Sequence, residues 1–440
     1  MRKNIKNVIA IGIILSAINS SIVPAFASDN TGSSNASELD FSYDNENSSN
    51  LQSGEATAGK TLLTLDKAIE AAINNSDKLT LKSREIKYYQ DKMDFQEKSN
   101  DFYEAINQKV YDYPYDKLKL QEKQTEQSKE FLKDQIVSDI TNKFNDIYLK
   151  QIDIDKSKRN LELKKNDLDY LKGKLSLGMS TDKQVNDALI ELRSLQDDIT
   201  AKENLLNDSK DYFKVLTDLD LKNTYELQYE MNYTKFKIDG SIDDYIDNKL
   251  DTYFKYDNKI LDLTKDYLKD LKDDGIKDVM DENPPTEPDK SKCVIKDGDG
   301  NTVFDSGTYA LSLINYEQEL LSYYEKLNSY GSYLDGKYNY NESKVKLEDT
   351  KKSLINVLKE NYSTLLDLEN KIDRLKEQVN STNTKLRFAK AQVDMGLMLQ
   401  NDYDKQVLAS NDLDTSLIKL VNTHSNLRDS IEKPWILSNK

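Results

Sequence analysis

The sequence predicts an all-α protein built from long antiparallel coiled-coil helical hairpins in two tandem repeats, with one small β-hairpin insertion. Its 440 residues are 37% hydrophobic and 32% charged, with only 14 Gly and 6 Pro, which suits long helices that each bury a narrow stripe. Two rows of apolar residues recur in steps of seven, and each row ends three residues before a glycine. The first row comprises Ile140, Ile147, Ile154, Leu161, Leu168 and Leu175 before Gly178; the second comprises Leu358, Leu365, Ile372, Val379, Leu386 and Val393 before Gly396. Matching offsets before two glycines indicate an internal repeat.

The N-terminus predicts a secretory signal peptide over residues 1–27. Its signals are a basic start at Arg2, Lys3 and Lys6, the apolar run "VIAIGIILSAI" over 8–18, and the small-residue cleavage site Ala25-Phe26-Ala27. Cleavage removes three positive charges and no negative ones, so the net charge goes from −16 to −19. We therefore expect an exported protein of the cell envelope or cell surface, in the outer membrane if the source has one. Such an acidic chain excludes nucleic acid as a partner.

The first predicted repeat covers residues 61–220, after a Ser- and Asn-rich linker over 28–60 that is expected to be disordered. The stretch "LTLDKAIEAAINNSDKL" predicts a short helix with Thr64 as N-cap. A helix to near Lys109 follows, and "YDYPYDK" (111–117) predicts a turn because proline lacks the amide donor. A long helix over about 118–177 is then expected to end at Gly178 and to return through a helix capped by Ser180 or Thr181.

The second predicted repeat covers residues 221–433, with a polar insertion over 273–307 and a tail over 434–440. "CVIKDGDGNTVF" within the insertion predicts a β-hairpin, because Asp-Gly turns between β-branched residues favour one. A helix over 308–330 is expected to stop at a second tyrosine-rich turn, "GSYLDGKYNYN" (331–341). The next long helix is expected to run to Met395, to turn at Gly396 and to return over 401–432.

Over about residues 62–433 the sequence resembles the TolC family of outer membrane efflux proteins. The opening helix "LTLDKAIEAAINNSDKL" is similar to that family's first helix. The two hairpin ends are similar to its paired helical turns. They carry Gly178-Met179 with Gln184-Val185, and Gly396-Leu397 with Asp402-Tyr403.

The resemblance implies a homotrimer whose helices form a hollow cylinder, a TolC-like α-barrel. It also implies a conduit for efflux or secretion that works with a periplasmic-adaptor-type protein and an inner-membrane pump, either ABC or proton-driven. The docking tips implied are Gly178, Met179, Gly396 and Leu397. In that family each copy also contributes membrane-spanning strands, for which the two tyrosine-rich turns are too short, so this chain is not expected to span a membrane. The alternative is a cell-surface coiled-coil scaffold or adhesin that transports nothing.

Four acidic residues near the glycine turns either ring a pore mouth that favours cations or lie on a solvated face. They are Asp182, Asp187, Asp402 and Asp404. Asp297, Asp299 and Asn301 of "DGDGN" are spaced like the start of a calcium loop, but Thr302 stands where that loop needs glycine. A tight turn is the other interpretation, and we expect no metal site.

The tyrosines of the two predicted turns either contact a wall polymer or membrane surface, or close the end of a helical bundle. The single histidine, His424, lies among apolar helix residues and is expected to be a packed residue. The sequence contains no phosphate-binding loop and no convincing catalytic set, so we predict neither an enzyme nor a cofactor.

Overall fold

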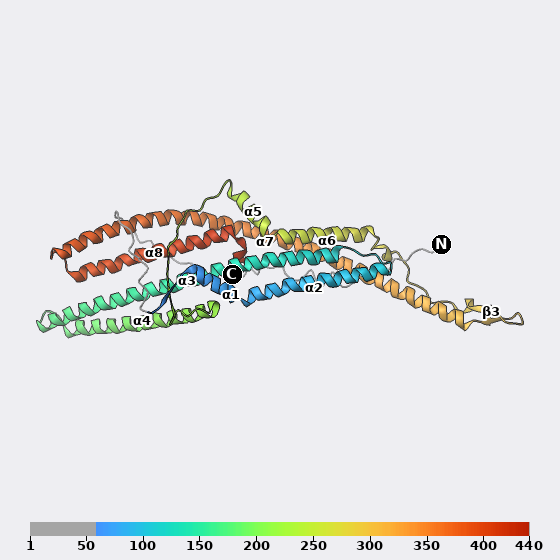
Figure 1. The fold of residues 1–440 in the computed structure, drawn as a ribbon, viewed down its shortest axis with the longest axis horizontal. Coiled ribbons are helices and arrows are strands. Elements are labelled where there is room, and N and C mark those ends of the chain that lie inside the picture. The colour runs from blue at the N-terminus through green and yellow to red at the C-terminus, as the bar shows by residue number, and fades with distance from the viewer. Residues whose placement is uncertain (1–58, 440) are drawn as a thin grey trace. The chain divides into compact units, whose positions relative to one another are not determined.

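The computed structural model describes residues 59–439, so the predicted signal peptide and nearly all of the predicted linker lie outside the described residues (Figure 1). The predicted all-α class is confirmed. The helices are α1 (Leu65–Asn74), α2 (Asp77–Ala105), α3 (Tyr113–Ser176), α4 (Asp182–Thr217), α5 (Ile242–Tyr253), α6 (Lys255–Asp273), α7 (Ser306–Asp394) and α8 (Gln400–Glu432). Short 3-10 turns cover Asp278–Met280, Lys290–Lys292 and Pro434–Asn439.

Two short strand pairs accompany the helices. β1 (Thr61–Leu63) pairs in parallel with β2 (Tyr225–Leu227), a pairing that the sequence analysis did not predict. β3 (Val294–Lys296) pairs antiparallel with β4 (Thr302–Phe304), which confirms the predicted hairpin. Within residues 59–439, none of the helices is both long and apolar enough to cross a membrane.

The chain divides into two compact units, each assembled from both halves of the sequence. Unit 1 contains Leu81–Ser128 and Asp251–Ser353, and unit 2 contains 59–80, Lys129–Leu250 and 354–439. The helices α3 and α7 each contribute one part to each unit.

Unit 2 contains two helical hairpins, α3 with α4 and α7 with α8, which Figure 1 shows in teal and green and in orange and red. It also contains α1, the β1–β2 pair and most of α5. The two rows of apolar residues lie between the helices of the hairpins: Ile140, Ile147 and Ile154 are buried on α3. Leu358, Leu365 and Ile372 are buried on α7. Toward the glycine turns the later members of each row, such as Leu175 and Val393, are only half-buried.

Polar bonds connect the two hairpins of unit 2 through α3 and α8. Asn426 Nδ2 donates to Asn142 Oδ1 over 2.7 Å, and Lys156 pairs with Asp412. Lys433 Nζ and Trp435 Nε1 both donate to the carboxylate of Asp134, at 2.8 and 2.9 Å. The helices of unit 2 are therefore held side by side by hydrogen bonds as well as by apolar packing.

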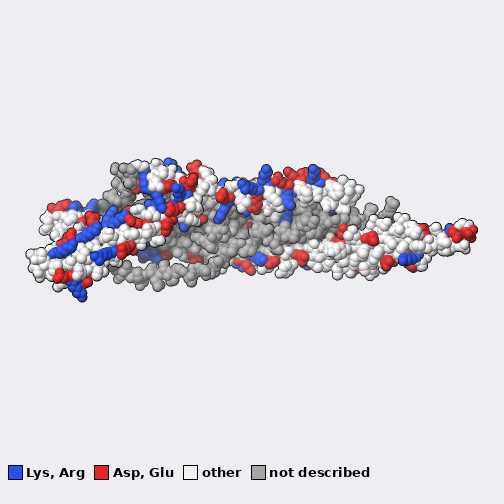
Figure 2. Space-filling view, turned by 90° about the horizontal axis from the view of Figure 1, so that it is seen from below, with Lys and Arg blue, Asp and Glu red and all other residues white. Residues whose placement is uncertain are grey.

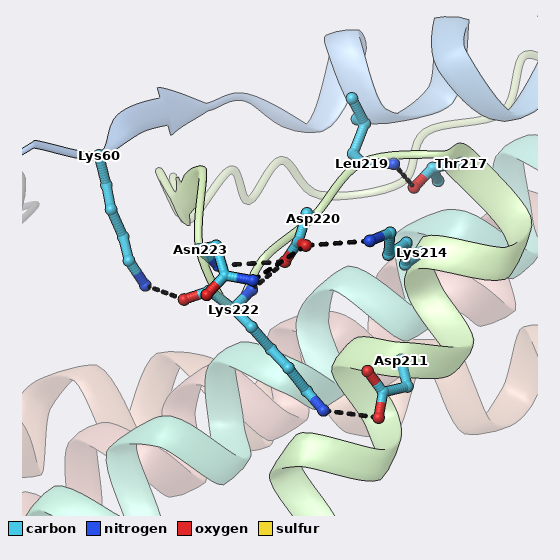
Figure 3. Close-up of polar contacts among 8 residues, drawn as sticks. All are labelled: Lys60, Asp211, Lys214, Thr217, Leu219, Asp220, Lys222 and Asn223. Carbon is cyan, nitrogen blue, oxygen red and sulfur yellow. Dashed lines mark hydrogen bonds and ion pairs between the residues drawn. The ribbon is translucent and has the colours of Figure 1, made fainter.

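The loop after α4 fixes the β1–β2 pair of unit 2 (Figure 3). The carboxylate of Asp220 accepts hydrogen bonds from Lys214, Asn223 and the amide of Lys222, and these bonds hold its pKa well below the usual range. Lys222 Nζ reaches Asp211 at 2.6 Å, and its carbonyl accepts from Lys60 Nζ at 2.8 Å just before β1 begins. This loop thereby attaches the start of the described chain to the end of α4.

Unit 1 packs α2, the start of α3, α6 and the first part of α7. Hydrogen bonds join α2 to α3 (Gln90 to Glu122, 2.7 Å), α3 to α6 (Gln124 to Asp257, 2.7 Å) and α6 to α7 (Lys351 to Asn258, 3.2 Å). One apolar cluster of this unit is rich in tyrosine. It contains Tyr113, Tyr267, Leu268, Leu271 and Tyr333, with Tyr111, Tyr330 and Tyr340 packed against them.

Two predicted boundaries are wrong. α3 begins at Tyr113, so Pro114 lies in its first turn, where the missing amide hydrogen would have had no helical partner anyway. α7 runs without a break through 331–341, where a second turn was expected. Tyr333 is buried in the tyrosine cluster of unit 1, and this packing offsets the roughly 1 kcal/mol that each glycine costs inside a helix.

Candidate docking tips at the two glycine turns

The two glycine turns of unit 2 have the same backbone geometry. Gly178 has φ +73° and Gly396 has φ +74°, both in the left-handed region. At the first turn the amides of Gly178 and Met179 donate to the carbonyls of Leu175 and Lys174 at 2.9 and 2.8 Å. At the second, the amides of Gly396 and Leu397 donate to Val393 and Gln392 over the same distances. Both turns are therefore Schellman caps, which satisfy the last carbonyls of a helix with amides from the turn.

The helices that leave the two turns begin differently. Thr181 caps α4 in a reciprocal capping box, in which Thr181 Oγ1 accepts from the Gln184 amide and Gln184 Oε1 accepts from the Thr181 amide. α8 begins after Leu399, whose apolar side chain cannot accept a hydrogen bond and so does not cap the helix. Of the two caps proposed from the sequence, Thr181 is the one that the structure uses.

Each turn presents apolar side chains to solvent. Met179 is 70% exposed and Leu397 is 75% exposed. Leu177, Met395 and Leu399 are exposed as well and were not among the residues that the sequence indicated. Leu177 and Met395 directly precede the two left-handed glycines, and Leu399 is the residue before α8, so all three belong to the turns. The turns thus form two small apolar knobs, which are called the tips below.

Asp167 on α3 connects the two hairpins near the tips. Two side chains at the start of α8 donate to Asp167 Oδ1: Asn401 Nδ2 at 2.7 Å and Lys405 Nζ at 2.9 Å. Burial raises the pKa of this carboxyl, but the bonds from Lys405 and Asn401 outweigh burial and leave the pKa lowered. The two tips therefore lie at the same end of unit 2.

The four acidic residues near the tips have different surroundings. Asp182, Asp187 and Asp402 are exposed, whereas Asp404 is half-buried and accepts from Gln400 Nε2 at 2.6 Å. Asp182 and Asp402 lie in the first turns of α4 and α8, where the helix dipole favours a carboxylate. Elsewhere acidic and basic side chains are interspersed on the face that Figure 2 shows.

The candidate calcium loop forms the turn between β3 and β4. The carboxylate of Asp297 accepts from the amides of Asp299 and Asn301 at 3.0 and 2.8 Å, so the turn itself occupies this oxygen. Among residues 59–439 no group of three or more His, Cys, Asp or Glu side chains is placed to hold a metal ion.

His424 is 1% exposed and lies 3.1 Å from Glu369 through its Nε2 atom. Glu369 also accepts from the amide of Phe236 at 2.7 Å, and Tyr233 contacts the imidazole ring edge-on. This histidine thus helps to hold the extended segment after β2 against α7 and α8, as a packed residue.

No protein-family model matches the chain, and no curated protein matches it. Among solved structures it is similar to the Campylobacter jejuni CmeC outer membrane channel, at 13% identity and a TM-score of 0.48, covering 92% of this chain and 94% of that one. It is also similar to the outer membrane protein VceC from Vibrio cholerae, at 10% identity and a TM-score of 0.47, covering 85% and 95%. The Neisseria gonorrhoeae MtrE outer membrane channel in its open state gives 10% identity and a TM-score of 0.40, covering 91% and 98%.

All three of these solved structures are outer membrane proteins, and each shares at most 13% identity with this chain. These likenesses concern the fold and say nothing about what this chain carries or binds.

Proposed function

We propose that this chain is the conduit subunit of an envelope efflux or secretion system. It acts as a homotrimer after export, and the tips Gly178, Met179, Gly396 and Leu397 bind a periplasmic-adaptor-type protein. That adaptor connects the conduit to an inner-membrane pump of the ABC or proton-driven type. Asp182, Asp187, Asp402 and Asp404 surround the mouth and favour cations there.

The observation that carries the proposal is the matched pair of tips. Both end in the same Schellman cap and both expose an apolar residue directly after the glycine. Apolar side chains held at a rigid turn lose contact with water only when another molecule covers them. Two equivalent knobs at one end of unit 2 suit a partner that also presents repeated helical hairpins.

The test is crosslinking of the mature chain to a co-expressed adaptor, with Met179→Asp and Leu397→Asp combined. Both side chains are exposed, so circular dichroism should show unchanged helicity, while crosslinking should fall at least about tenfold because two buried apolar contacts are replaced by charges. Met280→Asp with Leu311→Asp is the matched control, since these side chains are similarly exposed and lie in unit 1.

Undiminished crosslinking of the tip variant, or an equal loss in the control, would reject the tips as the docking surface. The surface-scaffold alternative would then be favoured. A monomeric parent chain would reject the conduit itself.

A further inference from the structure

The internal repeat makes the two hairpins of unit 2 comparable position by position. The shift that carries Gly178 onto Gly396 also carries Phe213 of α4 onto Ile431 of α8, and both of these side chains are 0% exposed. The two apolar rows before the glycines relate α3 to α7 by the same shift. A contact made by one of these helices therefore predicts a counterpart on the corresponding helix.

The two hairpins meet through one helix from each, α3 and α8. Asp167 on α3 pairs with Lys405 on α8 at 2.9 Å, and Lys156 on α3 pairs with Asp412 on α8 further from the tips. Figure 1 shows the resulting order of helices in this unit as α7, α8, α3 and α4. α4 and α7 thus lie at the two edges of the row.

The counterpart of the α3–α8 contact would join α7 to α4. Under the same shift, Asp167 corresponds to Lys385 on α7, and Lys405 corresponds to Asp187 on α4. The acidic and the basic position are exchanged, so the counterpart again places opposite charges together. Both side chains are exposed in the single chain. Because α4 and α7 lie at opposite edges of the row, this counterpart needs a second copy of the chain.

A second pair of opposite charges follows on the same two faces. Arg374 on α7 and Asp198 on α4 each lie eleven residues, about three turns, further from the tips, and both are exposed. Between the two aspartates, this face of α4 carries Ile190, which is 64% exposed, whereas its counterpart Leu408 on α8 is half-buried. The face of α4 is therefore built like the face that α8 presents to α3.

We propose that α7 of one copy packs beside α4 of the next copy, with Lys385 paired to Asp187 and Arg374 paired to Asp198. The two copies use different surfaces, so the contact is head-to-tail, as a ring requires. The next copy then continues the order of helices already present within one chain. This proposal rests on the proposed homotrimer and adds which helices of unit 2 join its copies.

The corresponding positions also set how far the contact extends. Asn426 on α8 donates to Asn142 on α3 within the chain, and the counterparts of these two residues are Asp208 and Glu360. Two exposed carboxylates repel each other, so they do not replace that hydrogen bond. The proposed contact therefore lies in the half of unit 2 nearer the tips.

Thiol crosslinking between copies of the mature chain tests the contact directly, after Cys293→Ser removes the single cysteine. When a chain with Asp187→Cys is co-expressed with a chain with Lys385→Cys, a short bismaleimide should give a product of twice the chain mass on a denaturing gel. Arg387→Cys in place of Lys385→Cys is the matched control. Residues two apart on a helix face different sides, so the control should give at least about fivefold less product.

Charge exchange tests the same pair without cysteines. Lys385→Asp should weaken the association of copies about threefold to tenfold in sedimentation, because it sets two carboxylates against each other. Adding Asp187→Lys should restore the parent's association to within about twofold, since opposite charges then meet again. Arg387→Asp makes the same charge change on another side of α7 and should alter association less than about twofold. A combined variant that associates no better than Lys385→Asp would overturn the proposal.

The mass of the parent chain, measured first, separates this proposal from the proposed conduit. A monomeric parent would reject both. A trimeric parent in which the Asp187→Cys and Lys385→Cys chains give no more product than the Arg387→Cys control would overturn this contact and leave the homotrimer in place.

Discussion

At the scale of single residues, unit 1 holds an ammonium group in its interior. Lys117 on α3 is 4% exposed, and its Nζ atom has no hydrogen-bond partner among residues 59–439. The ring of Tyr113 lies 5.7 Å away. Burial without a counter-charge disfavours the charged form and lowers the pKa of Lys117 to about 8. The sequence predicts a turn over 111–117, so the burial of Lys117 does not follow from the sequence.

Replacing Lys117 with methionine should stabilise the protein at neutral pH. The folded pKa lies below the ordinary value of 10.5, so the folded state holds this proton less strongly than the unfolded state does. The buried charge of Lys117 therefore destabilises the folded state fully below pH 8, and this destabilisation disappears as the pH rises from 8 to about 10.5. A shift of this size corresponds to about 3 kcal/mol at most. Urea denaturation at pH 7 and at pH 10 measures the difference between variant and parent.

Lys119→Met is the control for this prediction, because Lys119 lies two residues away and is exposed. It should change the unfolding free energy by less than about 0.5 kcal/mol at either pH. A Lys117→Met variant that is no more stable than the parent at pH 7 would show that the amine has a partner or water that offsets its burial.

At the scale of elements, a glycine inside α3 and a glycine just beyond its end have opposite roles. Gly173 is inside the helix, whereas Gly178, two residues past its last residue Ser176, has φ +73°. An added Cβ would meet nothing within 4 Å at either position. Any effect of alanine at these sites must therefore come from the backbone and not from packing.

We expect Gly173→Ala to stabilise the protein and Gly178→Ala to destabilise it, each by about 1 kcal/mol. Alanine favours the helix at 173 but must adopt a left-handed conformation at 178. The free energy of unfolding from urea titrations of the two variants measures both effects. Changes of the same sign would contradict the assignment of Gly178 as the left-handed cap. Gly396→Ala should behave like Gly178→Ala, because φ is +74° there.

The features that could be predicted from the sequence are those that residues close in sequence determine. The left-handed cap at Gly178 follows from glycine's missing Cβ, and the hairpin around "DGDGN" follows from turn chemistry. The continuation of α7 through Gly331 could not be predicted in this way. It depends on Tyr333 packing against Tyr113 and Tyr267, which are distant in sequence. The parallel pairing of β1 with β2 is missing from the sequence analysis for the same reason.

At the scale of the whole molecule, unit 1 leaves two apolar rows uncovered by its own helices. On α2 the row consists of Leu81, Tyr88, Phe95 and Phe102, in steps of seven, and all four are exposed. On α7 the row consists of Leu320, Leu327 and Leu334, also in steps of seven. Different rows on different helices suit a head-to-tail contact between copies, which gives a ring when the rotation between copies closes, and not a symmetric pair.

The proposed homotrimer predicts that sedimentation of the mature parent chain gives three times the monomer mass. Phe95→Glu combined with Phe102→Glu should shift the mass to that of the monomer. Each buried phenylalanine contributes about 1.5–3 kcal/mol, so losing two per contact weakens assembly at least about a hundredfold. Both side chains are exposed within the single chain, so its helicity should remain. Met280→Glu, exposed but outside both rows, should stay trimeric. A parent chain that is monomeric, or a double variant that keeps the parent's mass, would mean that the row on α2 is not the contact between copies.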